Sequence, residues 1–123
     1  MQDHPPPARI LEIAIAHLRE AVLPALSGRA AFDMRVTLGA LGLVQRALML
    51  TPASDAAEQA RLQDLLGQHG DLDALNRLLC ASIEAGEMNA DTPGLREHLR
   101  QTAMEKLAVD QPTYSAYRRA RDT

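Results

Sequence analysis

Few residues in this chain suit catalysis, nucleic-acid binding or covalent cross-linking. Its 123 residues include one cysteine, Cys80, so no disulfide can form within the chain. The aromatic residues are Phe32, Tyr114 and Tyr117, and the formal net charge is −3. Because nucleic-acid binding needs a basic surface and stacking rings, we expect no nucleic-acid partner.

Long apolar runs and targeting signals are also missing. No stretch of 18 or more consecutive apolar residues occurs, so we expect no membrane span. The first ten residues, MQDHPPPARI, lack the basic and apolar regions of a secretory signal. With a single cysteine, these features favour a cytoplasmic protein.

Strand signals are absent too, whereas apolar residues recur at helical spacing between turn signals. The sequence therefore predicts a compact all-α bundle of about five helices without a sheet, forming a single domain over residues 1–123. Three consecutive prolines predict an extended arm over residues 1–7. Expected helices cover residues 8–23, 29–50, 52–67, 71–86 and 92–111, with Thr51–Pro52 and Thr92–Pro93 as cap and first helical positions. Residues 113–123 form a basic tail that we expect to be frayed.

The motif HGD at residues 69–71, followed by Asn76, matches the catalytic loop of aminoglycoside-type kinases in spacing. Such a kinase also needs a phosphate-binding glycine-rich loop and a strand lysine. The only lysine is Lys106, within an expected helix, and no G-x-G-x-x-G is present. We therefore interpret Asp71 as the N-cap of a helix whose apolar stripe is Leu72, Leu75, Leu79 and Ile83.

Other catalytic patterns are also missing from the sequence. The four histidines, His4, His17, His69 and His98, show no i, i+4 pairing, so we predict no metal site. Asp71 and Asp73 resemble the start of a calcium loop, but Asn76 and Ser82 occupy its glycine and glutamate positions. We predict no catalytic residues and no cofactor.

The expected helix at residues 29–50 has apolar residues on most of its circumference. Phe32, Val36, Leu43 and Leu50 form one arc, and a second, broader arc runs from Met34 to Met49. Such a helix is central in its bundle or is covered on its outer side by another chain.

A narrow strip between the arcs contains Arg35, Gly39, Gly42 and Arg46. Two helical glycines cost about 1 kcal/mol each unless something packs closely against them. Three explanations are open: a close internal helix crossing, an interface with a partner protein or second copy, and an anion site formed by the two arginines.

Several segments together resemble a known protein family. They are VLPALSGRAAFDMRVTLGALGLVQRAL, LLGQHGDLDALNRLL, the IEAGE turn and LREHLRQTAMEKLAVDQPTY. They resemble a small bacterial helical family of unknown function, encoded beside aminoglycoside-phosphotransferase-like kinases and acyl-CoA dehydrogenases. The resemblance implies a non-catalytic accessory subunit of a kinase that phosphorylates 4-hydroxyacyl-CoA in levulinate-type catabolism. It implies no catalytic residue.

The kinase is accordingly the expected partner, and a homodimer is also plausible because an apolar arc would otherwise be exposed. The alternative function is a stand-alone binding module for an anionic acyl-CoA-like ligand, for which Arg35 and Arg46 would be the candidate contacts.

Overall fold

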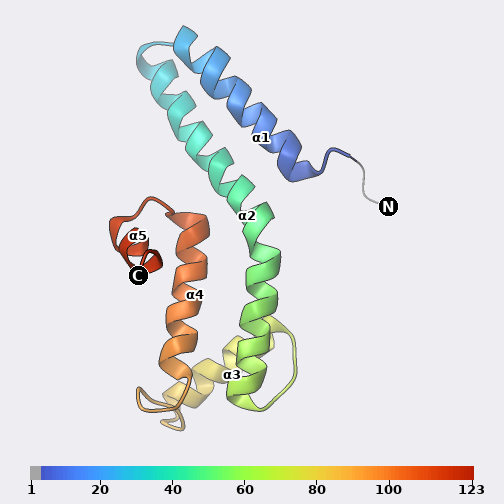
Figure 1. Cartoon of the computed structure of the whole chain (residues 1–123), viewed down its shortest axis with the longest axis vertical. Coiled ribbons are helices and arrows are strands. Elements are labelled where there is room, and N and C mark those ends of the chain that lie inside the picture. Colours follow the sequence, from blue (N-terminus) through green and yellow to red (C-terminus); the bar gives the residue numbers. More distant parts are fainter. Residues whose placement is uncertain (1–3) are drawn as a thin grey trace. The chain divides into compact units, whose positions relative to one another are not determined.

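The computed structural model describes residues 4–123, which form five α-helices and no strand (Figure 1). The predicted all-α class is confirmed. The helices are α1 (Pro7–His17), α2 (Gly28–Leu66), α3 (Leu72–Glu84), α4 (Leu95–Asp110) and α5 (Ser115–Arg121). Of the predicted arm, residues 1–3 lie outside the described part, residues 4–6 precede the first helix, and Pro7 begins it.

Helix α1 continues beyond His17 as a π-helical turn, Leu18–Val22, and a 3-10 turn, Leu23–Ala25. Pro24 lies in this last turn, close to the predicted helix end at residue 23. Of the predicted apolar face, Ile15 is buried, and Leu11, Leu18 and Val22 are half-buried. These four side chains therefore form the packed side of the first helix, as the spacing predicts.

Helix α2 is continuous over 39 residues, so the predicted break at Thr51–Pro52 is wrong. Proline removes one intrahelical hydrogen bond, but its fixed φ is compatible with a helix. Thr51 is consequently an interior helical residue and not an N-cap. The two helices predicted at residues 29–50 and 52–67 are the two halves of α2.

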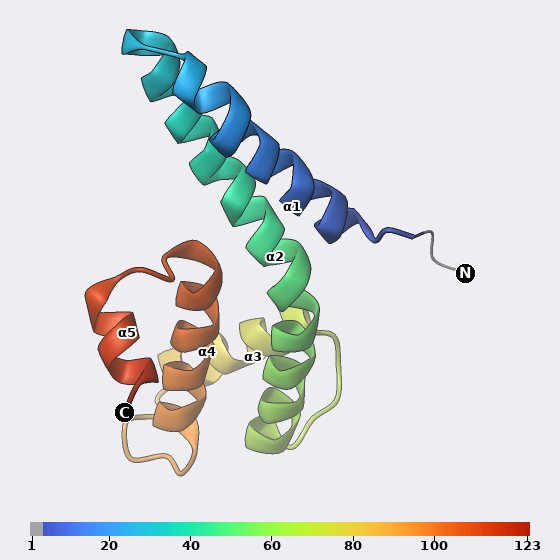
Figure 2. The same ribbon diagram turned by 45° about the horizontal axis from the view of Figure 1, so that its top comes forward.

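The chain divides within α2 into two compact units, residues 1–50 and residues 51–123. In the first unit, α1 and the first half of α2 run side by side in opposite directions (Figures 1 and 2). We call this unit the hairpin. Its buried residues are Ile15 from α1 and Ala31 and Leu38 from α2, among residues 4–50.

The second unit, which we call the helical unit, contains the end of α2 together with α3, α4 and α5. Four leucines from three helices form its core, each at most 4% exposed. They are Leu62, Leu75, Leu79 and Leu95. Leu75 and Leu79 belong to the predicted stripe of α3, whereas Ile83 at the end of that stripe is 41% exposed.

The ends of α3 and α4 follow different local rules. Gly86 has a φ of 76° just after α3, which fits the predicted helix stop. Helix α4 begins at Leu95, so the predicted start at Thr92–Pro93 is wrong. The hydroxyl of Thr92 instead accepts a hydrogen bond from the Asn89 amide at 2.9 Å, and Gly94, with a φ of 87°, precedes the helix. Thr92 therefore closes a turn.

The C-terminal residues expected to be frayed include α5, whose residue Tyr117 is 9% exposed. Arg118, Arg119 and Arg121 lie in the last turn of this helix. Arg121 is positioned 5.8 Å above the Tyr117 ring, a cation–π distance.

Candidate functional site

The HGD motif forms the start of a helix. Asp71 has an extended backbone conformation, and its Oδ1 atom accepts a hydrogen bond from the Ala74 amide at 2.8 Å. This is the geometry of an N-cap, so the predicted role of Asp71 is confirmed. The Gly70 carbonyl, one residue earlier, accepts a hydrogen bond from the Gln59 side chain at 2.7 Å.

Asn76 serves a different structural purpose. Its Nδ2 atom donates hydrogen bonds to Glu58 Oε1 at 2.9 Å and to the Leu72 carbonyl at 3.2 Å. Asp71 and Asn76 thus bind separate groups of their own chain. Their side chains do not present a shared pair of metal ligands, as a kinase catalytic loop would require.

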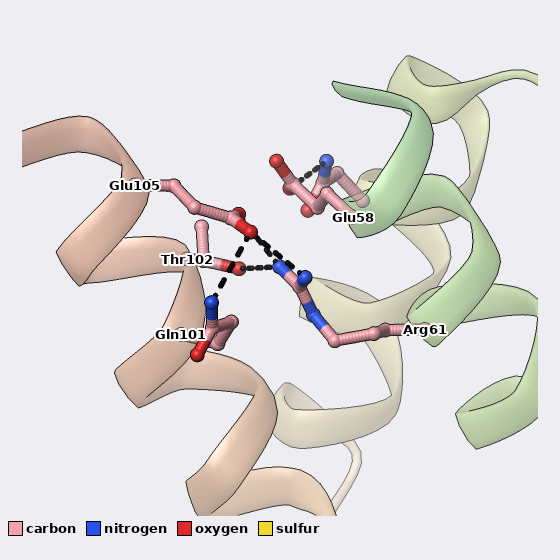
Figure 3. Close-up of polar contacts among 6 residues, drawn as sticks. Glu58, Arg61, Gln101, Thr102 and Glu105 are labelled. Carbon is pink, nitrogen blue, oxygen red and sulfur yellow. Dashed lines mark hydrogen bonds and ion pairs between the residues drawn. The ribbon is translucent and has the colours of Figure 1, made fainter. Parts of the chain in front are cut away.

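The strongest polar contact of the helical unit joins α2 to α4 (Figure 3). The Arg61 guanidinium donates to the Glu105 carboxylate at 3.0 and 2.8 Å, and to the Thr102 hydroxyl at 3.2 Å. The Arg61 and Glu105 side chains are 25% and 16% exposed. A bidentate, mostly buried pair of this kind fixes the orientation of the two helices.

The environment of this pair changes the pKa of neighbouring groups. Hydrogen bonds from Arg61 lower the pKa of Glu105, which keeps the carboxylate charged. Burial, and then the positive charge of Arg61, lower the pKa of His98. His98 is 4% exposed, and its Nδ1 atom is buried without a hydrogen-bond partner. These groups therefore form a structural ion pair beside a neutral histidine.

Arg61 itself lines a cleft of about 320 Å³, together with Asp64 and His98. Two further clefts lie near the pair. The smaller, of about 210 Å³, has four carboxylates and one lysine in its wall. These residues are Asp55, Glu58, Glu105, Asp110 and Lys106. The larger, of about 460 Å³, is lined by polar groups that include Asn76 and His98, and by apolar residues from α3. Within residues 4–123, no group of histidine, cysteine, aspartate and glutamate is arranged to hold a metal ion.

The predicted strip of Arg35, Gly39, Gly42 and Arg46 lies in the hairpin, on α2. A Cβ atom built at Gly39 would have no neighbouring atom within 4 Å, and one at Gly42 would lie 3.3 Å from the Arg46 guanidinium. Within the hairpin, no segment crosses closely over either glycine. The strip and the Arg61–Glu105 pair share no residue. The ion pair could not be predicted from the sequence, because Arg61 and Glu105 are 44 positions apart.

Next to the strip, the first predicted arc of α2 is exposed. Phe32 and Val36 are 55% and 58% exposed, and Leu43 and Leu50 are 39% and 38% exposed. The second arc contains the buried Leu38 and the half-buried Met34 and Leu41. Val44, Leu48 and Met49 of the same arc are 48–61% exposed. The hairpin therefore covers the N-terminal part of the second arc and leaves the first arc uncovered.

Helix α2 is also the one helix in residues 4–123 that is long and apolar enough, by length and composition, to cross a membrane. Only 6% of its most apolar window is buried. A core helix of a soluble protein or a signal sequence can meet the same criterion. The expected absence of membrane contact remains a prediction.

Comparison with known families gives one match, to a domain of unknown function (DUF6285) over residues 24–114. The matched region contains α2, α3 and α4, whereas α1 and α5 lie outside it. No curated protein and no solved structure matches the chain.

Proposed function

The chain belongs to the family defined by this domain of unknown function, and we propose that it is a non-catalytic accessory subunit. It would bind and support an aminoglycoside-phosphotransferase-like kinase that acts on hydroxyacyl-CoA in the cytoplasm. The identity of the partner rests on the sequence resemblance described above. The case for a protein partner rests on the exposed apolar surface of the hairpin.

That surface is large for so small a unit. Nine large apolar side chains within residues 4–50 are 38–61% exposed. They are Ile10, Ile13, Phe32, Val36, Leu43, Val44, Leu48, Met49 and Leu50. At roughly 60–100 Å² each, they present on the order of 500–900 Å² in total, divided among α1 and the two arcs of α2, against the ~800 Å² that one partner contributes to a standard interface. The area therefore supports a protein-binding role.

The polar groups of the helical unit support the same proposal. Asp71 and Asn76 are used in capping and packing, and Arg61 and Glu105 pair with each other. Each of these side chains has a structural partner that explains its position. Binding energy from the hairpin could instead favour the competent conformation of the kinase, which is how a subunit without catalytic groups supports turnover.

An anionic acyl-CoA-like ligand fits the smaller cleft of about 210 Å³ poorly. The wall of the smaller cleft has four carboxylates against one lysine, so it would repel phosphate groups. This cleft therefore does not support the alternative of a stand-alone acyl-CoA binding module, whose candidate contacts, Arg35 and Arg46, lie in the hairpin.

The test is a turnover assay of the purified kinase with and without this chain, together with co-purification. The variant Ile10→Asp with Ile13→Asp places two charges on the outer side of α1, where both residues are more than half exposed. We expect loss of the complex and of the stimulated turnover. Ile83→Asp is the matched control, since this isoleucine is 41% exposed but belongs to the helical unit. Equal turnover with and without the chain, and no complex, would refute the accessory role.

A further inference from the structure

The exposed arc of α2 has the spacing of a coiled-coil seam. Its positions alternate by four and three residues from residue 32 to residue 50, and four of the six residues are large and apolar. We call this set the α2 seam: Phe32, Val36, Gly39, Leu43, Arg46 and Leu50. A repeat of this period keeps one face of a helix turned toward a partner helix over its whole length. The seam covers 19 residues, or about 28 Å of helix.

The α2 seam faces away from α1. At 100° per residue, its apolar members lie 100–160° around the helix from the buried residues Ala31 and Leu38, and they are 38–58% exposed. Helix α1 packs beside the first half of α2 in both views of the ribbon (Figures 1 and 2). Within the hairpin, α1 therefore cannot cover the seam.

We propose that the α2 seam binds the α2 seam of a second copy of this chain, with the two helices antiparallel. Reversing the seam about its midpoint, between Gly39 and Leu43, superimposes it on itself. Phe32 then faces Leu50 of the second copy, Val36 faces Arg46, and Gly39 faces Leu43. A twofold axis produces such a self-complementary contact, in which each pairing occurs twice.

The size and charge of these pairs favour the antiparallel arrangement. Leu43 would enter the space over Gly39, where no atom lies within 4 Å. Arg46 would lay its aliphatic stem along Val36. A parallel pair would instead place Gly39 against Gly39, which leaves a gap, and Arg46 directly against Arg46 within the seam.

The area is sufficient for a dimer of moderate affinity. The eight large side chains, four from each copy, together supply on the order of 500–800 Å² of apolar area at roughly 60–100 Å² each. Since interfaces are about 57% apolar, the total is about 900–1,400 Å², close to the lower bound of specific interfaces. Ile10 and Ile13 of α1 and Val44 and Leu48 of α2 lie outside the seam and stay available to another partner. The dimer can therefore form whether or not the kinase is bound, and it leaves apolar side chains for the kinase to bind.

Two arginines, Arg35 beside the seam and Arg46 within it, give binding to a second copy a different dependence on salt than binding to an acidic partner. In the antiparallel pair, Arg35 of one copy lies near Arg46 of the other, so these charges oppose association. We therefore expect Arg46→Leu and added salt to strengthen the dimer, by about tenfold for the variant. An acidic partner protein would respond in the opposite way, since both changes would weaken its attraction to the arginines.

The experiment is light scattering and sedimentation of the full chain over a range of concentrations. We expect a mass of twice 13.4 kDa at high concentration for the wild type. Leu43→Asp should weaken association by at least about 100-fold, because it would bury a charge in the seam. Ile83→Asp is the control and should leave the dimer intact, and the helical content of both variants is checked by circular dichroism.

Cross-linking tests the register, with Cys80→Ser as a background that has no cysteine. A mixture of Phe32→Cys and Leu50→Cys chains should form a mixed disulfide, and neither chain should cross-link readily to itself. Self-cross-linking of both variants would overturn the antiparallel pairing. A wild-type chain that stays monomeric at all concentrations would overturn the dimer itself. Flotation of that monomer with phosphatidylethanolamine and phosphatidylglycerol vesicles would assign the seam to a membrane surface instead.

Discussion

The two units of this chain use apolar residues in opposite ways. In the helical unit, Leu62 and three other leucines are at most 4% exposed and meet at one core. In the hairpin, Phe32, Val36 and Met49 are more than half exposed, and Ile15, Ala31 and Leu38 are the buried residues among 4–50. The hairpin is the more apolar unit, with 28 apolar residues among its 50 positions against 29 among the 73 of the helical unit. The helical unit nevertheless forms its own core, whereas the hairpin leaves much of its apolar surface suited to association.

The contrast between the two units predicts that a substitution in the core of the helical unit causes the largest loss of stability. Leu62→Ala should lower the free energy of unfolding by about 2–5 kcal/mol, because it leaves a cavity at a fully buried position. Leu43→Ala removes the same atoms from a side chain that is 39% exposed and should cost less than about 1 kcal/mol in the monomer. Urea denaturation at low protein concentration measures both, and equal losses would contradict the contrast.

The next largest effect is expected at the ion pair between α2 and α4. Arg61→Ala would leave the mostly buried Glu105 carboxylate without its main partner. Because both side chains retain some exposure, we expect a loss of about 2–3 kcal/mol, below that of a fully buried pair. The double variant Arg61→Met with Glu105→Leu removes both charges and should recover part of the stability. No recovery would show that the loss comes from the missing pair itself and not from an unpaired Glu105 carboxylate.

A smaller loss is predicted at the N-cap of α3. Asp71→Ala removes the acceptor for the Ala74 amide and should cost about 1 kcal/mol, whereas Asp71→Ser keeps an acceptor and should be nearly neutral. Thermal unfolding of the two variants provides the comparison. If Ala and Ser at this position had the same stability, the capping role would be wrong.

In the hairpin, replacing a glycine should raise the free energy of unfolding, whereas the substitutions described above lower it. Gly39 lies in a helix and faces open space, so Gly39→Ala should stabilise the monomer by up to about 1 kcal/mol. Gly86→Ala is the contrasting control, since a φ of 76° is strained for alanine and this variant should be destabilised. Both are best measured in a Leu43→Asp background, so that association does not contribute.

A graded pH effect is expected in the helical unit. The pKa of His98 is lowered in the folded chain, so the unfolded chain binds more protons as the pH falls below about 6.5. Stability should therefore decrease on acidification below that pH. His98→Gln should reduce the slope between about pH 7.5 and pH 5.5. An unchanged slope in this variant would assign the pH dependence to other groups.

Much of the helical unit could be predicted from sequence because local chemistry determines it. Asp71 as an N-cap, the Leu75 and Leu79 stripe and the stop near Gly86 all depend on neighbours within a few positions. Thr51–Pro52 has the same local signature of a helix start, yet α2 continues through it. Neighbouring residues alone could not distinguish a proline that begins a helix from one inside it.

The polar contacts between helices were beyond prediction for a different reason. Arg61 and Glu105 are ordinary surface residue types, and only the packing of α2 against α4 brings them together. The exposed arc of α2, in contrast, could be predicted, because the spacing of apolar residues indicates two apolar arcs on this helix. Sequence could identify that face, but not whether the chain itself would cover it.

The most direct test of the difference between the units is hydrogen exchange along α2, in the wild-type chain and in Leu43→Asp at the same concentration. We predict that the variant loses amide protection over residues 30–48, while residues 54–66, which belong to the helical unit, exchange as in the wild type. Unchanged protection in both segments, or equal loss in both, would contradict the account that the surface of association lies on the hairpin and not on the helical unit.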